Sequence, residues 1–282
     1  MKTESHLDYF TSSYFEIKSP RELNLFSPEF EVEEPIRPMP HYDLAWRLKC
    51  GGLLNIAHGE AQGARIDLGG QALQYCRDNG MRDSEVIQQL SEPNDFKQVT
   101  RLDYCWDIES AGSVRHAANH WKAGKCKSTL RGNPEGYINY GNRAGRTIYF
   151  GSKKSTQRVR IYDKGTEMKL LNQALLRIEI QVRKPHAQAM YIDSISSTLA
   201  IAARSRLRTL LDFPSLQWWQ RALKGDVEPL TTVERKQPKW QSWLLGQVTA
   251  SIINRYQKDE NGDREIIESW FKNITKVLTG ML

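Results

Sequence analysis

GRTIYFGSKKSTQRVRIYDKGTEMKLLNQALLRIEIQVRK, residues 145–184, is the stretch that decides the fold. Three short runs within it alternate apolar and polar residues, at Thr147–Phe150, Arg158–Tyr162 and Leu176–Arg183. Alternation with a period of two is typical of strands that bury one face. The sequence therefore predicts three strands of one sheet, each with an apolar face and a polar face.

The polar faces of these runs carry groups that could act on a phosphodiester. One face of the middle run holds Arg160, Tyr162 and Lys164, and one face of the last run holds Arg177, Glu179, Gln181 and Arg183. A tyrosine beside cations, and a carboxylate between arginines, are what phosphodiester chemistry at a phenol requires. Charge is also normal on a solvated sheet face, so the pattern by itself leaves an ordinary polar surface open.

Composition indicates a globular protein. The chain has 282 residues, of which 39% are hydrophobic and 26% charged, enough for one large domain or two moderate ones. Its four scattered cysteines form no C-x-x-C pair, which argues against a zinc ribbon or a disulfide framework and for a reducing compartment. No run approaches the ~18 apolar residues of a membrane span, and the N-terminus lacks an apolar signal segment. We therefore expect a cytoplasmic protein that has no contact with a membrane.

Basic charge gathers in the stretch quoted above. The net charge is +7, yet residues 1–110 hold 11 basic and 19 acidic residues, whereas residues 121–190 hold 15 basic and 4 acidic ones. Such a density is typical of a surface that binds a polyphosphate. Three of the four acids, Asp163, Glu167 and Glu179, lie beside Tyr162 or on the next predicted strand.

Three regions follow from the pattern along the chain. Residues 1–40 are acidic and dotted with prolines, and we expect an N-terminal arm with little regular structure. Residues 41–185 should form an α+β core on an antiparallel-rich sheet, and residues 186–282 a helical region. Within the core we expect strands at 42–48, 64–68 and 100–108, and helices at 84–90 and 111–123.

The core contains a faint internal repeat. ARIDLGG followed by RLD at residues 101–103 parallels RTIYFGS followed by RIE at residues 177–179. A duplication of two halves would place Asp103 and Glu179 at equivalent positions on adjacent strands. Two carboxylates from distant parts of the chain would then face one site.

The C-terminal region has helical patterns at 187–211, 247–256 and 264–278. We expect its tryptophans to be core residues, although base stacking by one of them is an alternative. These are Trp218, Trp219, Trp240 and Trp243.

A tyrosine can attack a phosphodiester and keep the bond energy as a phosphotyrosine. Its phenol has an ordinary pKa of about 10 and needs activation at neutral pH. A divalent cation on the scissile phosphate, with Lys or Arg nearby, would supply that activation. Hard cations such as Mg²⁺ or Mn²⁺ prefer carboxylate oxygens, and Asp103 and Glu179 are the obvious donors.

The motifs TIYFGSKKS, RVRIYDKGTE and LRIEIQVR, preceded by QGARIDLGGQAL and TRLDYCWD, resemble the Rep_trans family of rolling-circle replication initiators. The family comprises plasmid and filamentous-phage initiators and some relaxases of integrative elements. The resemblance spans about residues 42–183 and is most specific in the G-S-x-x-S, Y-D-K and R-I-E motifs. It implies an enzyme that nicks one strand at an origin, stays on the 5′ phosphate and leaves a 3′ hydroxyl as primer.

The resemblance also implies roles for individual residues. Tyr162 would be the nucleophile, Asp103 and Glu179 the metal-linked carboxylates, and Glu167 a further acid of the metal site. Lys164 and Arg177 would face phosphate. The basic residues of the same stretch are the predicted DNA contacts, namely Lys153, Lys154, Arg158, Arg160 and Arg183. The DNA would be an origin duplex or hairpin with a single strand at the nick, while a host helicase and a second copy of the chain stay open as partners.

Several rival interpretations stay open on the residues alone. A relaxase for element transfer would use the same chemistry, a DNA-binding regulator would only hold backbone on the basic face, and a water-using nuclease would use the same acids as metal ligands. Tyr149 is a second candidate nucleophile, although we expect it to be a buried or edge residue. His116 and His120 have the i, i+4 spacing of metal ligands on a helix, but no Glu or Cys nearby completes a site, which favours a solvated pair.

Overall fold

A computed structural model of the chain describes residues 3–15, 17–23, 27–58, 63–109, 113–130, 135–137, 146–169 and 175–233, together with Glu268, Ser269 and Lys272. The chain divides into two compact units, Met1–Val233 and Glu234–Leu282. Almost all described residues belong to the first unit. The predicted helix at 247–256, Trp240 and Trp243 lie outside the described residues, and of the predicted helix at 264–278 only the three residues named above are described, all helical.

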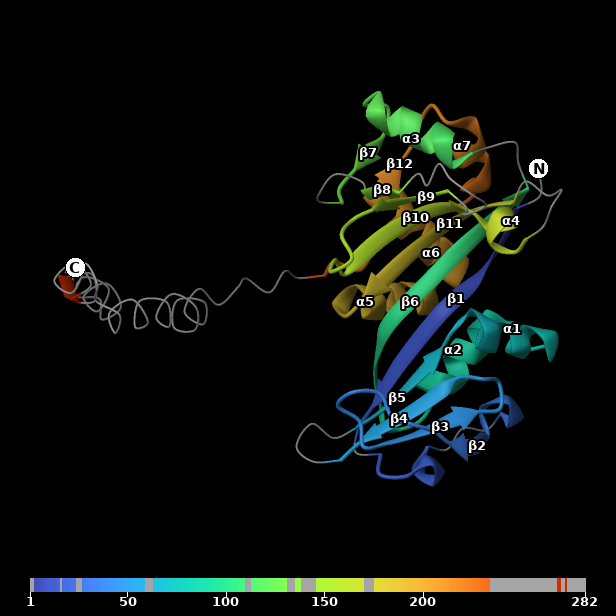
Figure 1. Cartoon of the computed structure of the whole chain (residues 1–282), viewed down its shortest axis with the longest axis vertical. Helices are drawn as coiled ribbons and strands as arrows, with labels where there is room; N and C mark the ends of the chain where they lie inside the picture. Colours follow the sequence, from blue (N-terminus) through green and yellow to red (C-terminus); the bar gives the residue numbers. More distant parts are fainter. Residues whose placement is uncertain are drawn as a thin grey trace. The chain divides into compact units, whose positions relative to one another are not determined.

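The first unit is an α+β fold built on one large antiparallel sheet, as the sequence predicts (Figure 1). Its strands follow the order β2-β3-β4-β5-β1-β6-β11-β10-β9-β8. Their bounds are β1 (Thr3–Tyr14), β2 (Val32–Pro35), β3 (Leu44–Leu48), β4 (Leu53–Ala57), β5 (Gly63–Leu68), β6 (Phe96–Glu109), β8 (Glu135–Tyr137), β9 (Thr147–Phe150), β10 (Gln157–Asp163) and β11 (Leu175–Arg183). Two short strands, β7 (Lys127–Ser128) and β12 (Leu211–Asp212), pair separately.

Strand β1 lies in the middle of the sheet, between β5 and β6, so the expectation of an arm with little regular structure over residues 1–40 is wrong. A β-bulge hides the strand in the sequence. The register against β6 shifts between Leu7 and Tyr9, and the buried Leu7 and Phe10 are therefore three residues apart instead of two. The bulge breaks the alternation by which strands are recognised.

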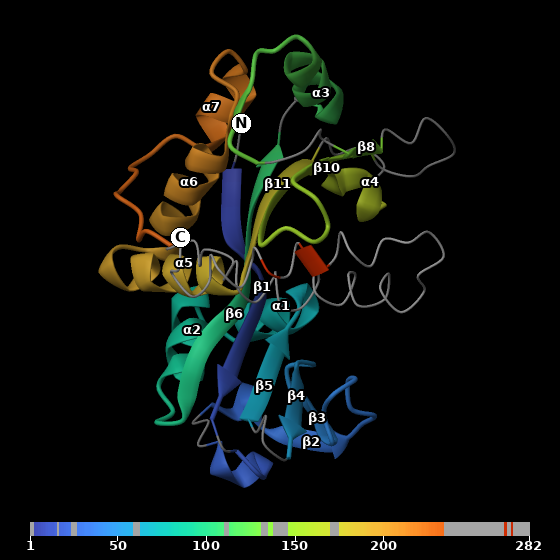
Figure 2. The same ribbon diagram turned by 90° about the vertical axis from the view of Figure 1, so that its left-hand side faces the viewer.

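Helices cover the apolar face of the central strands. α2 (Asp83–Ser91), α5 (Pro185–Ser196) and α6 (Leu199–Leu210) lie on the same side of β1 and β6 (Figure 2). The predicted helix at 187–211 is thus two helices, because Thr198 ends the first segment and caps the second through its hydroxyl, which accepts from the N–H of Ile201. The remaining helices are α1 (Gly70–Asp78), α3 (Val114–Lys122), α4 (Lys164–Glu167) and α7 (Gln217–Ala222).

The core forms between these helices and the sheet. Leu102, Trp106 and Ile108 of β6 and Ile178 and Ile180 of β11 are completely or almost completely buried. Trp218 and Trp219 on α7 are buried as well, which confirms the expected core role of this pair. Among the described residues, no helix is long and apolar enough to cross a membrane.

Strands β6 and β11 are neighbours in the sheet and pair antiparallel along their whole overlap. The sequence predicted this adjacency from the RLD and RIE motifs. The duplication of two halves, from which the adjacency was argued, stays a prediction. The register places the polar side chains of both motifs on one surface of the sheet, on the side away from the helices. We call this surface, which includes Arg101, Asp103, Arg177 and Glu179, the charged face.

Candidate functional site

The charged face is assembled by the register of three strands. Arg160 of β10 stands opposite Glu179 of β11, and Glu179 stands opposite Cys105 of β6. Two positions along β11, Gln181 stands opposite Asp103 of β6. The motifs that the sequence singles out, about 75 residues apart in the chain, therefore meet within three adjacent strands.

Tyr162 lies on this face beside the acids. Its ring is 4.8 Å from the Arg160 guanidinium carbon and 5.8 Å from Lys164 Nζ, and the residue is 6% exposed. Burial, and next the charge of Glu179, raise the pKa of the Tyr162 phenol, while Arg160 and Arg177 oppose the shift. Within the described residues, no hydrogen bond engages its hydroxyl. The phenol is therefore positioned beside cations but is protonated at rest.

Asp103 and Glu179 are both 1% exposed. Arg101 donates to both carboxylate oxygens of Asp103 at 3.1 and 2.5 Å, Gln181 donates at 2.9 Å, and Arg160 forms an ion pair with Glu179. Burial raises the pKa of both carboxyl groups; for Glu179, where Arg160 opposes the shift and the negative charge of Asp103 adds to it, the pKa reaches about 8. The two acids thus share one electrostatic environment.

Arg177 has a different role from the one the sequence suggests. It is 5% exposed, and it donates twice to Asp107, at 2.6 and 2.7 Å, and once to Asp8 at 2.8 Å. Its Nη2 also lies 3.3 Å from His6 Nε2. The geometry assigns Arg177 to a clamp that joins β11 to β6 and β1, and not to a surface that faces phosphate.

Lys164 and Glu167 lie on α4, directly after β10. They form an ion pair with each other at 2.8 Å, and the Glu167 side chain is 53% exposed. The strand ends before Glu167, so Glu167 lies on α4 and pairs with Lys164, and its charge is a lesser cause of the raised pKa of Tyr162.

The predicted DNA contacts divide into two groups. Lys153 and Lys154 are exposed in the turn between β9 and β10. Arg158, Arg160 and Arg183 are half-buried on the strands, with the Arg158 guanidinium 3.9 Å above the ring centre of Tyr149. A track of positive charge therefore leads from the β9–β10 turn along β10 towards Tyr162.

Among the described residues, no hydrogen bond or ion pair joins the rival candidates to Asp103 or Glu179. Tyr149 is half-buried beneath Arg158 on β9. On α3, the His120 ring contacts the backbone carbonyl of His116 at 3.0 Å. Neither histidine belongs to a group of metal-ligand side chains among the described residues.

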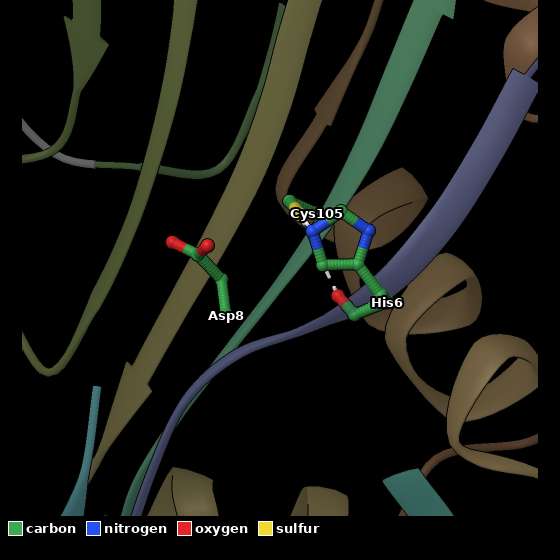
Figure 3. Close-up of side chains that lie close together, drawn as sticks. All are labelled: His6, Asp8 and Cys105. Atoms are coloured by element: carbon green, nitrogen blue, oxygen red, sulfur yellow. Dashed lines mark hydrogen bonds between the residues drawn. The ribbon is translucent and has the colours of Figure 1, made fainter. Parts of the chain in front are cut away.

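A second set of functional groups comes from β1 and was missed by the sequence analysis. His6 and Asp8 project beside Cys105, where β1 passes β6 (Figure 3). One donor atom from each of these three residues lies within 4.8 Å of the others, which could hold a metal ion. Alternation within the predicted strand at 100–108 places Cys105 on the same face as Asp103, but its two partners lie on β1, which the sequence analysis does not predict.

Comparisons with known proteins concern the family and the fold of the chain. The model of the Rep_trans family, described as replication initiation factor, matches residues 97–272, which is more than half of the chain. A solved structure of a rolling circle replication initiator protein from Geobacillus stearothermophilus is similar in fold, with a TM-score of 0.58 and 18% identity over 86% of this chain and 92% of that one. No curated protein matches the sequence.

Proposed function

Because the chain belongs to the Rep_trans family of replication initiation factors, we propose that it initiates rolling-circle replication by nicking one DNA strand through Tyr162. The observation that carries the proposal is the meeting of Tyr162, Arg160, Glu179 and Asp103 on one face of adjacent strands. The family implies DNA as the partner, and the basic track along β10 offers a path for a single strand.

The nucleophile is assigned by motif and by its position beside the acids, because among the described residues the Tyr149 hydroxyl has no hydrogen bond either. Tyr162 stands next to the acids, and its hydroxyl has no hydrogen-bond partner among the described residues. Arg160 contacts both the ring and Glu179, so it fixes the phenol relative to the carboxylates. In the reaction, the phenol oxygen attacks phosphorus, the bond from phosphorus to the 3′ oxygen breaks, and the 3′ oxygen takes up a proton. The products are a 5′-phosphotyrosine and a free 3′ hydroxyl.

A divalent cation fits the donor set of the acids. Asp103 and Glu179 are buried and repel each other, and among the described residues their ion-pair partners are Arg101 and Arg160. Two carboxylates in this arrangement are the oxygen donors that Mg²⁺ or Mn²⁺ prefers. Such a cation would polarise the scissile phosphate. Since the charge of Glu179 is one cause of the raised pKa of Tyr162, neutralising that charge would also ease loss of the phenolic proton.

The test uses oligonucleotides that tile the DNA flanking the coding sequence, both as hairpins and as single strands, with Mg²⁺ or Mn²⁺. We expect one strand to be cut and a covalent protein–DNA adduct to accumulate. Tyr162→Phe should lose the adduct and keep DNA binding. Tyr149→Phe is the matched control, because Tyr149 is a half-buried tyrosine on the neighbouring strand and also lies beneath an arginine. This variant should form the adduct normally.

Other outcomes separate the rival functions. Cleavage without an adduct would support a water-using nuclease, and a mobility shift without cleavage would support a DNA-binding regulator; either would refute the proposal. A relaxase for element transfer would give the same adduct, so a plasmid maintenance assay and a transfer assay must separate these two roles. A host helicase and a second copy of the chain stay open as partners of the C-terminal region, residues 186–282.

A further inference from the structure

We propose that His6, Asp8 and Cys105 form a second cation site, selective for a borderline metal of the Zn²⁺ class, beside the carboxylate pair. Within the described residues this is the one group of three or more metal-ligand side chains whose donor atoms lie within 4.8 Å of one another. Two of its members come from β1, outside the region matched by the family. The inference does not depend on the nicking chemistry.

The backbone brings the three donors to one place. His6 and Cys105 are directly opposed across β1 and β6, with the ring nitrogen Nε2 3.2 Å from Sγ (Figure 3). Asp8 lies at the bulge between Leu7 and Tyr9, on the same side of β1 as His6. Its carboxylate has an oxygen within 4.8 Å of the donor atoms of His6 and Cys105.

The contact of His6 with Arg177 favours the tautomer that binds metal through Nε2. Arg177 Nη2 lies 3.3 Å from Nε2, and a guanidinium can only donate a hydrogen bond. A neutral ring that accepts this hydrogen bond carries its proton on Nδ1, and its Nε2 then faces Arg177 and the Cys105 thiol.

Arg177 is a cation in contact with two of the three donors, and it has an anchor of its own. Its two hydrogen bonds to Asp107 hold it on β6 independently of His6 and Asp8. Metal binding would replace the contact of Arg177 with His6 and displace the thiol proton of Cys105 to solvent. A divalent ion with one thiolate and one carboxylate forms a neutral unit. The ion brings two positive charges and one thiol proton leaves, so the charge of the group rises from the −1 of Asp8 to zero, while Arg177 keeps its pair with Asp107.

The donor set distinguishes this site from the carboxylate pair. Thiolate and imidazole favour Zn²⁺ or Co²⁺, whereas Mg²⁺ and Mn²⁺ favour oxygen ligands alone. Cys105 is directly opposite Glu179 in the register, so the two sites are adjacent. A bound Zn²⁺ would cross-link β1 to β6 next to the acids and so fix the strand that the bulge leaves irregular.

The test titrates the full chain, stripped of metal by a chelator and kept reduced, with Co²⁺ as a spectroscopic probe. We expect one Co²⁺ per chain to produce the thiolate-to-cobalt charge-transfer absorption in the near ultraviolet, and Zn²⁺ but not Mg²⁺ to abolish it. Cys105→Ala should lose the band. Cys126→Ala, which removes a thiol that is half-buried elsewhere, is the matched control and should keep it. His6→Ala should weaken Co²⁺ binding about 10-fold or more while the protein stays folded by circular dichroism.

Two further variants keep this result separate from the nicking proposal. Asp103→Asn should lose cleavage and retain the cobalt band, and Cys105→Ala should retain a Mg²⁺-dependent adduct. Absence of a thiolate band in the native chain would overturn the inference, as would a band that survives Cys105→Ala. Should Cys105→Ala fail to fold, the His6→Ala titration decides the matter, because unchanged affinity there is incompatible with an imidazole ligand.

Discussion

Two tyrosines on the charged face of the sheet are held in similar ways but differ in their hydroxyl groups. Tyr162 lies beneath Arg160, which pairs with Glu179, and Tyr9 on β1 lies 3.7 Å beneath Arg101, which pairs with Asp103. Tyr9 is directly opposite Asp103 in the register. The acids of the site are thus flanked on both sides by a tyrosine under an arginine.

The difference lies in what each phenol binds. The Tyr9 hydroxyl donates to Asp67 at 3.1 Å, and Asp67 is itself held by Thr11 and by two hydrogen bonds from Arg65. The Tyr162 hydroxyl has no such partner among the described residues. The comparison teaches that a tyrosine beneath an arginine and beside an acid is not enough to identify a nucleophile. A hydroxyl that donates a hydrogen bond within the sheet stabilises it, and a hydroxyl without such a partner is available for chemistry.

The largest expected effect tests the difference between Tyr162 and Tyr9 directly. Tyr162→Phe should reduce the covalent adduct below detection, because it removes the only atom that can form the ester. Tyr9→Phe should leave the adduct near its native level and lower the free energy of unfolding by about 1 kcal/mol, the usual worth of the hydrogen bond to Asp67. The measurements are adduct formation on gels and urea unfolding. A Tyr9→Phe variant without adduct would reverse the assignment.

Replacing Glu179 and replacing Asp67 should likewise have different effects on cleavage. Glu179→Gln should slow cation-dependent cleavage by about 100-fold or more, since a metal ligand supplies several kcal/mol of stabilisation to the transition state. Asp67→Asn should cleave normally but unfold more easily, by about 1–3 kcal/mol, because Arg65, Thr11 and Tyr9 lose a charged acceptor. Single-turnover rates at several Mg²⁺ concentrations and thermal unfolding provide the readouts. Equal cleavage by both variants would remove Glu179 from the site.

A third contrast compares Arg177, which pairs with Asp107 and Asp8, with Arg65, which pairs with Asp67. Arg177→Met should destabilise the protein by about 3–5 kcal/mol, because it leaves Asp107 and Asp8 without their buried partner. Arg65→Met should cost less, about 1–3 kcal/mol, since Asp67 is buried but keeps the hydroxyls of Tyr9 and Thr11 as hydrogen-bond donors. Denaturant unfolding measures both. A larger loss for Arg65 than for Arg177 would show that the clamp at Arg177 contributes little.

The sequence predicts much of this fold because most strands alternate regularly. The pairing of β6 with β11, and of β10 with β11, brings together Asp103, Glu179 and Tyr162 as the RLD, RIE and YDK motifs suggest. Periodicity and motif are local properties, and both are intact in these strands.

What the sequence could not predict depends on β1. Its bulge interrupts the alternation, and its acidic, proline-rich surroundings resemble a solvated arm. The contacts of Arg177 with Asp8 and His6 join residues 169 and 171 positions apart, so no local signal announces them. Tyr9 and the cation site proposed at His6, Asp8 and Cys105 are missed for the same reason.

The smallest expected effect concerns DNA binding and compares lysines in the two halves of the sheet. Lys153 and Lys154 lie in the turn next to the Tyr162 set, whereas Lys49 lies between β3 and β4, in the other half of the sheet. Replacing Lys153 and Lys154 by alanine should weaken single-strand binding and lower the slope of log affinity against log salt by about 1.4, or 0.7 per lost phosphate contact. Lys49→Ala should leave the slope unchanged. Fluorescence anisotropy at several salt concentrations makes the comparison, and equal slopes for all variants would argue against a strand path over the β9–β10 turn.

The most direct measurement maps the covalent adduct to a residue. Protein trapped on a cleaved oligonucleotide is digested with nuclease and protease, and the peptide that retains a nucleotide is sequenced by mass spectrometry. The expected result is a phosphotyrosine at residue 162 within the peptide that contains IYDK. A phosphotyrosine at Tyr9 or Tyr149, or cleavage that leaves no modified peptide, would contradict the assignment of Tyr162 as the nucleophile.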